Sequence, residues 1–359
     1  MEKKKLIDMM PKHRPLVIAG PCSAETEEQV LQIAHAFKDK DVDIFRAGIW
    51  KPRTRPGSFE GVGAVGLPWL KLVQEETGLP VTIEVANAKH VDEAIKAGID
   101  VLWIGARTTA NPFAVQEIAD ALQGVDIPVL VKNPVNPDVA LWLGAIERLE
   151  KSGIKEIGAI HRGVSQFKKS IYRNNPEWQM AIDLRQLRPD ILLINDPSHI
   201  TGNRELVGRV SQIALDMKFD GLMIETHNNP DEAWSDAAQQ VTPDQLQLIF
   251  NRLTIKKEVP EGVTLDDIEE LRKTINYIDE QLIELLSYRM NVVNDVADFK
   301  KKHKMTVFQE KRWNNLSEAR KKQAESKQLC PDFITKIFDE IHIESIQRQM
   351  QIINDKKKV

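Results

Sequence analysis

Four side chains far apart in the sequence could together hold a divalent metal ion. They are one thiol, one imidazole and two carboxylates, from Cys22, His199, Glu225 and Asp236. A donor set of such mixed softness suits Mn²⁺, Fe²⁺, Co²⁺ or Zn²⁺, and it suits Mg²⁺ or Ca²⁺ poorly. Singly, each residue has a plainer interpretation: Cys22 could be a small packing residue, and Asp236 could start a helix. Together they predict a metal site, provided that the fold brings their loops to one place.

Basic residues also follow apolar runs of the sequence. The stretch DIFRAGIWKPRTRPGSFEG places three cations in one loop, although the chain has a net charge of −4. The cations that directly follow apolar runs are Lys51, Arg53, Arg107, Lys132 and Arg162. Converging cations repel one another unless they bind anions, and the planar fork of Arg matches phosphate and carboxylate. Their number predicts substrates with more than one anionic group.

Eight short apolar runs must position these loops. They span residues 16–20, 44–49, 81–85, 101–105, 128–132, 156–160, 191–195 and 221–225, with helical stretches between them. Continuous Val/Ile/Leu runs that alternate with helices are typical of parallel strands buried on both faces. Eight such units in residues 1–253 predict an α/β fold, the (β/α)₈ (TIM) barrel, whose active site lies at the carboxyl ends of the strands. A doubly wound open sheet is the competing fold, but it would seldom reach eight units so evenly.

The pattern changes after Leu253. Residues 254–263, TIKKEVPEGV, predict a linker because charges, Pro and Gly gather there. Residues 264–359 show helical spacing and no strand pattern, which predicts an all-α domain. We expect one helix that reaches about Lys302, followed by two shorter helices near 309–325 and 331–353. Because so long a first helix leaves little core within one chain, we expect a homodimer through this domain, or a higher homo-oligomer.

Polar residues of the helical domain could bind a small dianion. Arg289 and Lys300 are 11 positions apart, about three helical turns, and therefore share a face. Arg272 lies 17 positions before Arg289, about 25 Å along a helix axis, so a small ligand cannot touch both in one chain. An antiparallel partner helix could bring a second Arg272 close, and Ser345 and Gln349 offer neutral hydrogen bonds. The plainer alternative is a solvated basic face on a dimerisation helix.

Composition narrows the class of protein. The 49 basic and 53 acidic residues and a pI near 6.1 argue against binding to nucleic acid or to a membrane surface. The N-terminal stretch lacks the apolar core of a signal peptide, and no run approaches the roughly 20 apolar residues that cross a bilayer. The only two cysteines are Cys22 and Cys330, and we expect no disulfide between them. We therefore expect a cytoplasmic protein.

Seven motifs carry a family resemblance, and they occur in the order GPCS, KPRT, GAR, VKNP, HRG, DPSH and IETH. With them, residues 10–253 resemble the 3-deoxy-D-arabino-heptulosonate 7-phosphate (DAHP) synthases and are most similar to their type Iβ branch. The resemblance implies condensation of phosphoenolpyruvate with erythrose 4-phosphate and water to DAHP and phosphate. This reaction is the first step of the shikimate pathway, which leads to the aromatic amino acids.

The resemblance also assigns roles to the barrel's candidate residues. It makes Cys22, His199, Glu225 and Asp236 the ligands of a divalent metal, and we expect Mn²⁺ there, ahead of Fe²⁺, Co²⁺ or Zn²⁺. Phosphoenolpyruvate would be held by Arg107, Lys132 and Arg162, with Lys51 at its reacting end. The aldehyde substrate would be held by Arg53 and Thr54, with Ser58 at its phosphate.

A sister family is the alternative for the barrel. The 3-deoxy-D-manno-octulosonate 8-phosphate synthases share the fold and the use of phosphoenolpyruvate. They typically carry a KANRT loop where this chain has KPRT. Turnover of erythrose 4-phosphate compared with arabinose 5-phosphate separates the two.

The segment LRKTINYIDEQLIELLSYRMNVVNDVADFK resembles the first helix of AroQ-type chorismate mutases, and the resemblance extends to about residue 351. These enzymes rearrange chorismate to prephenate without a covalent intermediate. The family pattern points to Arg272, Arg289, Lys300, Arg312, Ser345 and Gln349, with Arg272 donated across an intertwined dimer. Cations would hold the two carboxylates, while Lys300 and Gln349 would stabilise the ether oxygen in the transition state.

Two positions depart from the mutase pattern. In VFQEKRW, Gln309 stands where many members have Asp, and Trp313 stands where a Glu usually helps to bind the substrate hydroxyl. A buried hydroxyl without a partner costs roughly 1–3 kcal/mol, so this change could weaken chorismate binding.

The sequence thus predicts a bifunctional enzyme with a metal-dependent synthase barrel and a chorismate mutase domain. We further expect feedback on the barrel by prephenate or chorismate, because one chain joins an early and a late pathway step. As alternatives, the helical tail is a non-catalytic allosteric sensor or a dimerisation module.

Overall fold

The computed structural model describes residues 5–51, 57, 59–166, 170–256 and 265–354. The chain forms two compact units that divide between residues 258 and 259. This division falls inside the predicted linker, and the domain limits at residues 253 and 264 stay predictions.

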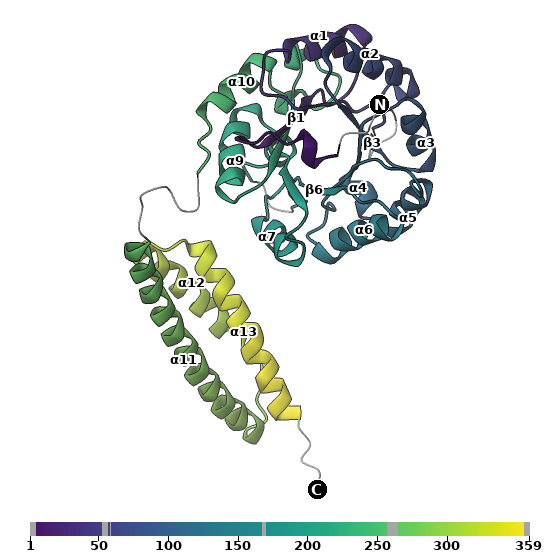
Figure 1. Cartoon of the computed structure of the whole chain (residues 1–359). Helices are drawn as coiled ribbons and strands as arrows, with labels where there is room; N and C mark the ends of the chain where they lie inside the picture. Colours follow the sequence, from purple (N-terminus) through teal and green to yellow (C-terminus); the bar gives the residue numbers. More distant parts are fainter. Residues whose placement is uncertain (1–4, 52–56, 58, 167–169, 257–264, 355–359) are drawn as a thin grey trace. The chain divides into compact units, whose positions relative to one another are not determined.

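Eight parallel strands close into a barrel in sequence order, with β1 paired to β8 (Figure 1). The strands are β1 (Leu16–Gly20), β2 (Ile44–Arg46), β3 (Val81–Val85), β4 (Val101–Ile104), β5 (Val129–Lys132), β6 (Ile157–His161), β7 (Leu192–Asn195) and β8 (Gly221–Glu225). Nearly all of their residues are buried, as expected of parallel strands covered on both faces. The predicted (β/α)₈ barrel is confirmed.

Helices form the outer ring of the barrel (Figure 1). The longer ones are α1 (Glu27–Ala36), α2 (Leu67–Thr77), α3 (Ala88–Lys96), α5 (Pro112–Ala121), α6 (Val139–Lys151), α7 (Trp178–Leu187), α9 (Arg204–Asp216) and α10 (Pro243–Arg252). Short helices α4 (Ala106–Thr109) and α8 (Pro197–Thr201) directly follow β4 and β7. Several helices begin at side-chain caps in which Thr26, Asn87, Asp138 or Asn203 accepts a backbone N–H.

Two layers of apolar side chains hold the barrel. Alternate strand residues such as Ile18, Trp103 and Met223 fill the lumen, where Leu6 from the N-terminal segment joins them. The other strand residues pack outward against the helices in one large core. A lumen filled by side chains is a solid platform, so the chemistry is left to the loops at its ends.

The second strand is shorter than its apolar run predicts. The run continues to Ile49, but β2 ends at Arg46. The carbonyl of Gly48 accepts a hydrogen bond from the N–H of Ala24, in the loop after β1, at 3.0 Å. An added Cβ at Gly48 would lie only 2.4 Å from the carbonyl oxygen of Cys22. The chain therefore leaves the sheet here to pack against the loop that carries Cys22.

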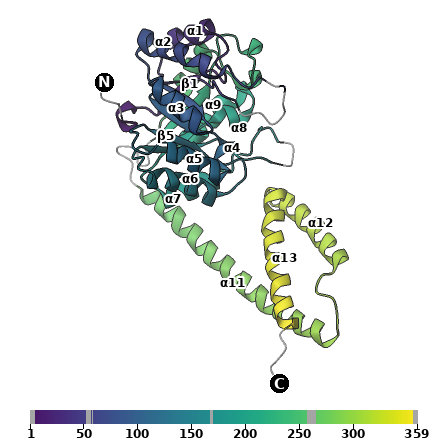
Figure 2. The same ribbon diagram turned by 90° about the vertical axis from the view of Figure 1, so that its right-hand side faces the viewer.

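Within residues 265–354, the described part of the second unit, the chain forms three helices, which Figure 2 shows. They are α11 (Asp266–Lys302), α12 (Glu310–Ser326) and α13 (Pro331–Asn354), close to the predicted ranges. Much of the apolar surface of α11 is exposed in a single chain, including Leu271, Ile275, Ile278, Leu282 and Leu285. Such a face needs a partner surface, which is consistent with the predicted dimer.

Among the residues that the structure describes, no helix is both long and apolar enough to span a bilayer. Cys22 is buried and Cys330 is exposed, and both are free thiols.

Candidate active sites

Three of the four predicted metal ligands meet at the carboxyl end of the barrel strands. One donor atom each from Cys22, Glu225 and Asp236 lies within 4.8 Å of the other two. Cys22 follows β1, Glu225 ends β8, and Asp236 belongs to the loop after β8. Because Gly20 of β1 pairs in register with Glu225, the closure of the barrel brings the first two ligands together.

His199, the fourth predicted ligand, lies beside this cluster on α8. Its Nε2 atom is 3.7 Å from Glu225 Oε1, and its Nδ1 atom is 2.8 Å from Asp196 Oδ2. Asp196 is also the N-cap of α8 and accepts a hydrogen bond from the backbone N–H of His199. One buried carboxylate therefore orients both the backbone and the ring of His199, with Nε2 toward Glu225.

Burial and charge set the protonation of this cluster. Burial raises the pKa of the Cys22 thiol to about 12, and the Glu225 carboxylate adds to the rise. Burial also opposes ionisation of Glu225, yet His199 and Arg46 lower its pKa. The same holds for Asp236: burial raises its pKa, but the charges of Arg173 and His199 lower it by more. The carboxylates are therefore ionised, whereas the thiol must lose a proton before it can bind a metal.

The donor atoms fit a divalent metal ion. Glu225 Oε1 is buried and accepts no hydrogen bond, although Arg46 Nη2 lies 3.2 Å away. Cys22 Sγ lies 3.4 Å from Asp236 Oδ2. A buried carboxylate oxygen without a hydrogen bond is costly unless a cation compensates it. Arg46 supplies part of this compensation, and a metal that accepts sulfur, nitrogen and oxygen ligands would add to it.

Two of the predicted lysines lie at the same end of the barrel. Lys51 Nζ donates to Cys22 Sγ at 3.0 Å. Lys132 Nζ donates to Asp196 Oδ2 at 2.7 Å, and this ion pair is almost fully buried. Asp196 thus holds both Lys132 and the candidate ligand His199, which connects the cationic residues to the metal cluster.

Two of the three predicted arginines of this end, Arg107 and Arg162, belong to the described residues, and the charge of Arg107 acts on Arg162. Burial lowers the pKa of Arg162 to about 10, and the charges of Arg173 and Arg107 add to the effect. Arg162 is oriented by Asn174, whose Oδ1 accepts from its Nη1 at 2.9 Å, and by Asn133, whose Oδ1 accepts from its backbone N–H. Like charges destabilise cations that are buried close together, and a bound anion offsets this destabilisation. This group of arginines is therefore suited to binding a phosphate or a carboxylate.

Arg46 is a site residue that the sequence analysis missed. Its side chain is 1% exposed, and its guanidinium lies 4.9 Å from the ring centroid of Trp103 as well as beside Glu225. A charged residue inside an apolar strand can be buried only if other groups compensate its charge. The sequence shows this pattern, because Arg46 lies within the apolar run of residues 44–49. The predicted residues Arg53, Thr54 and Ser58 lie outside the described residues.

The helical unit contains a pocket of about 740 Å³ between α11, α12 and α13. Arg289 Nη1 donates to Ser345 Oγ at 2.7 Å, and Lys300 Nζ donates to Gln349 Oε1 at 2.9 Å. Arg312 of α12 lines the same pocket. Five of the six residues predicted from the mutase pattern are thus brought to one place, because α11 and α12 both pack against α13.

This pocket is cationic. Burial lowers the pKa of Arg289 and of Lys300, and Arg312 adds to the effect on Lys300. Arg320, which the sequence analysis did not single out, also lines the pocket and lies 4.1 Å from the ring centroid of Phe338. Four cations around one cavity predict an anionic ligand.

The two departures from the mutase pattern, Gln309 and Trp313, also line the pocket. The Trp313 ring stacks on His342 of α13, with centroids 3.9 Å apart and planes at 18°. The Trp313 side chain is half-buried, and this ring contact joins α12 to α13. Trp313 therefore contributes to packing where an acceptor is usual.

Arg272 does not reach this pocket within one chain. It is exposed and donates to Glu269 on its own helix at 2.6 Å. The 17-residue spacing on α11 explains this, as the sequence analysis expected.

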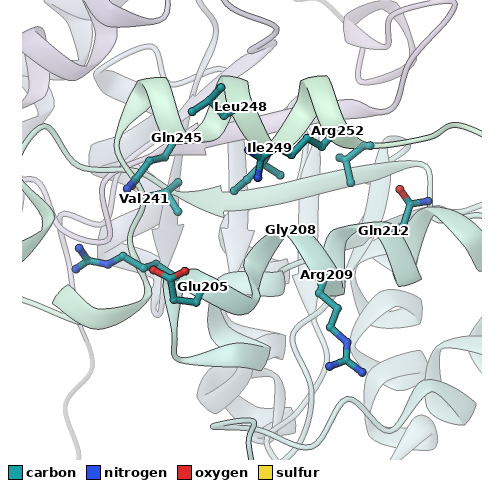
Figure 3. A pocket seen from close by; sticks show the side chains of 11 residues that line it. Glu205, Gly208, Arg209, Gln212, Val241, Gln245, Leu248, Ile249 and Arg252 are labelled. Carbon is teal, nitrogen blue, oxygen red and sulfur yellow. The ribbon is translucent and has the colours of Figure 1, made fainter.

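A separate hollow lies on the outside of the barrel between α9 and α10 (Figure 3). Its volume is about 430 Å³, and Glu205, Arg209, Leu248 and Ile249 are among its lining residues. None of the predicted site residues lines it.

Known families match both units of the chain. Residues 7–259 match the DAHP synthetase I family, and residues 271–350 match chorismate mutase type II. The first match covers well over half of the chain. The chain belongs to the DAHP synthetase I family. Its helical unit carries the chorismate mutase type II domain.

Relatives of this DAHP synthetase I chain are named for related activities. A phospho-2-dehydro-3-deoxyheptonate aldolase of Thermotoga maritima is 31% identical over 225 residues, which are 63% of this chain and 64% of that protein. The chain thus spans just under two thirds of the length of that relative. A 2-dehydro-3-deoxyphosphooctonate aldolase of Legionella pneumophila (strain Corby) is 26% identical over 278 residues, covering 70% of this chain and 96% of that protein.

Solved structures share the fold of the DAHP synthetase I barrel. The crystal structure of phospho-2-dehydro-3-deoxyheptonate aldolase (DAHP synthase) from Thermotoga maritima has a TM-score of 0.60 at 28% identity and covers 67% of this chain and 69% of that one. A truncated form of the 3-deoxy-D-arabino-heptulosonate 7-phosphate synthase from Thermotoga maritima has a TM-score of 0.57 at 25% identity, covering 67% and 86%.

Proposed function

We propose that this chain is a bifunctional enzyme of the shikimate pathway. Its barrel acts as a transferase that condenses phosphoenolpyruvate with erythrose 4-phosphate and water to DAHP and phosphate. Its helical unit acts as an isomerase that converts chorismate to prephenate. The observation that carries the proposal is the meeting of Cys22, Glu225 and Asp236 beside buried cations, at the strand ends of a DAHP synthetase I barrel.

In this proposal Cys22, His199, Glu225 and Asp236 hold a divalent metal, with Mn²⁺ favoured over Fe²⁺, Co²⁺ or Zn²⁺. The bound metal would polarise the carbonyl of the aldehyde substrate as a Lewis acid. Asp196 keeps the ring of His199 oriented, since it lies 2.8 Å from Nδ1 and caps the helix that carries the residue.

The basic residues hold the two anionic substrates in reacting positions. Arg107, Lys132 and Arg162 bind phosphoenolpyruvate, and Lys51, which donates to Cys22 Sγ at 3.0 Å, acts at its reacting end. Arg53, Thr54 and Ser58 bind the aldehyde substrate. A carbon–carbon bond then joins the enol to the aldehyde carbon, water adds to the former enol carbon, and phosphate leaves. Holding both substrates in one dry site removes most of the entropic cost of this encounter.

The helical pocket acts by electrostatic complementarity. Arg289 and Arg312, with Arg272 of the partner subunit, bind the two carboxylates of chorismate. Lys300 and Gln349 already contact each other at 2.9 Å, and both stabilise the ether oxygen as its bond breaks. Ser345 orients Arg289 through its 2.7 Å hydrogen bond.

The assembly and location follow from the same proposal. The exposed apolar face of α11 pairs two chains into a homodimer, which completes each mutase pocket, and a higher homo-oligomer remains compatible with it. Prephenate or chorismate bound in the pocket would regulate the barrel. A cytoplasmic location stays a prediction of the sequence, as does the lack of nucleic-acid and membrane partners.

The alternatives are less well supported. A 3-deoxy-D-manno-octulosonate 8-phosphate synthase barrel is disfavoured, because relatives named for that activity are 26% identical against 31% for the heptonate enzyme. A tail that only senses metabolites or dimerises does not require the contact between Lys300 and Gln349 deep in the pocket.

Chorismate turnover by the full-length protein tests the second activity. Loss of chorismate absorbance should be matched by formation of prephenate, and Arg289→Ala should abolish both. Saturable prephenate binding without turnover would make the helical unit a sensor. No binding of either compound would leave dimerisation as its only function.

A further inference from the structure

In each of the two carboxylates of the metal cluster, Asp236 and Glu225, one oxygen is bonded to a neighbouring polar side chain and the other faces the cluster. Asp236 Oδ1 accepts a hydrogen bond from Arg173 Nη1 at 2.9 Å, while Asp236 Oδ2 faces Cys22 Sγ at 3.4 Å. Glu225 Oε2 accepts from Gln239 Nε2 at 2.7 Å, while Glu225 Oε1 accepts no hydrogen bond and lies 3.2 Å from Arg46 Nη2. Each carboxylate therefore has one oxygen tied to the protein and presents the other to the cluster.

The two residues that tie these oxygens are joined to each other. Arg173 Nη1 also donates to Gln239 Oε1 at 2.8 Å. The result is one chain of hydrogen bonds, Asp236–Arg173–Gln239–Glu225, which links the loop after β6 to β8 and to the loop that follows it. A movement of either carboxylate would break a bond in this chain.

The backbone around this chain is shaped to hold it. Asp236 has a φ of +47°, a left-handed conformation that a non-glycine residue keeps only when its surroundings hold it. Arg173 packs against Gly202, where an added Cβ would lie 2.5 Å from the Cβ of Arg173. The N–H of Arg173 donates to the carbonyl of Thr201 at 3.2 Å. Arg173 is thus held from its backbone outward, not only by its charge.

We infer that Arg173 and Gln239 are positioning residues of the metal site: each holds one oxygen of a carboxylate, so that Asp236 and Glu225 would present their other oxygens to a bound ion. This inference rests on the proposed metal-dependent activity of the barrel. The side chain of Arg173 is 48% exposed, so its ion pair with Asp236 stabilises the fold only slightly, and its effect is on orientation. Residues that orient metal ligands in this way typically change metal affinity by about 10–100-fold.

Two substitutions separate orientation from electrostatics, because neither changes the net charge. Arg173→Lys keeps the cation, but the shorter side chain places no donor where Nη1 of Arg173 donates to both Asp236 and Gln239. Gln239→Leu keeps the approximate size but cannot donate to Glu225. As a matched control, Arg185→Lys makes the same change in an ion pair with Asp220, to which Arg185 Nη2 donates at 2.8 Å.

The measurement is a Co²⁺ titration of the metal-free, full-length protein, followed by the near-ultraviolet charge-transfer band of a thiolate bound to Co²⁺. Arg173→Lys and Gln239→Leu should each weaken Co²⁺ binding by about 10–100-fold, whereas Arg185→Lys should bind as the unaltered protein does. Far-ultraviolet circular dichroism identifies folded variants, and either folded variant decides the question because the two lie on different elements.

Two results would overturn the inference, and they differ in what else they overturn. If the unaltered protein shows the band and both variants bind Co²⁺ with its affinity, Arg173 and Gln239 do not position the ligands, and the proposed metal site stands. If the unaltered protein shows no thiolate band, the metal site itself is wrong, and the inference falls with it.

Discussion

Acidification should destabilise the barrel through His161. This residue ends β6 next to Arg162, is fully buried, and lies among the rings of Trp142, Trp178 and Phe219. Its Nδ1 accepts a hydrogen bond from Asn195 Nδ2 at 3.1 Å, so the ring is bound in its neutral form. Burial lowers its pKa from 6.5 to about 4, and the charge of Arg162 adds to this.

The direction in which stability changes with pH follows from proton binding to His161 in the folded and unfolded states. Between pH 4 and 6.5 the unfolded chain binds a proton at His161 and the folded chain does not, so stability is lost as the pH falls through this window. This difference between the pKa values of the unfolded and folded states lowers the free energy of unfolding by about 3 kcal/mol once the pH is below both values. About 2 kcal/mol of this is lost between pH 7 and pH 5. Above pH 7 the effect is absent.

The assay compares urea unfolding of the unaltered protein with that of His161→Asn at pH 7, 6 and 5. Asn keeps an acceptor where Nδ1 lies but does not titrate, and any cavity that it leaves costs the same at each pH. Six of the seven tryptophans lie in residues 1–253, so tryptophan fluorescence follows mainly the barrel. The unaltered protein should lose about 2 kcal/mol more free energy of unfolding than the variant between pH 7 and 5. Equal losses would refute the reasoning.

Other perturbations should affect one unit at a time. Removal of divalent metal by a chelator should abolish DAHP formation and leave chorismate turnover unchanged, which parallel assays of one sample would check; loss of both would contradict separate sites. Gln349→Leu should lower kcat for chorismate by about 10²–10³-fold with a smaller change in KM, since Gln349 and Lys300 act on the transition state; a change confined to KM would argue against that role. Trp313→Glu, which restores the usual mutase residue, should raise KM for chorismate because the stack on His342 is lost. Trp313→Phe should retain most of the activity. Improved turnover by the Glu variant would show that the missing acceptor matters more than the stack.

The strands of the barrel could be predicted because both of their faces are buried. A strand covered on both faces is apolar throughout, so all eight could be recognised from short Val/Ile/Leu runs. The end of the second strand was not predictable, since it depends on the contact between Gly48 and the loop of Cys22, which are far apart in the sequence. Helix α11 was predictable because its apolar spacing continues over ten turns.

The candidate sites were predictable only in part. Residues that directly follow strands, such as Cys22 and Lys132, are identified by their place at the carboxyl end of the barrel. Arg173 lies in a loop and Gln239 in a 3₁₀ helix of three residues, Ala237–Gln239, so neither shows periodicity, and only the folded chain brings them to Asp236 and Glu225. Arg46 could have been found from the sequence, because a charge inside an apolar strand needs a buried partner.

The most direct test of the central claim is consumption of phosphoenolpyruvate by the full-length protein, measured with erythrose 4-phosphate and with arabinose 5-phosphate, before and after removal of metal. The proposed function predicts stoichiometric release of phosphate with erythrose 4-phosphate, little with arabinose 5-phosphate, and none until Mn²⁺ is restored to the metal-free protein. Turnover of arabinose 5-phosphate in preference, or turnover that survives the complete removal of metal, would contradict it.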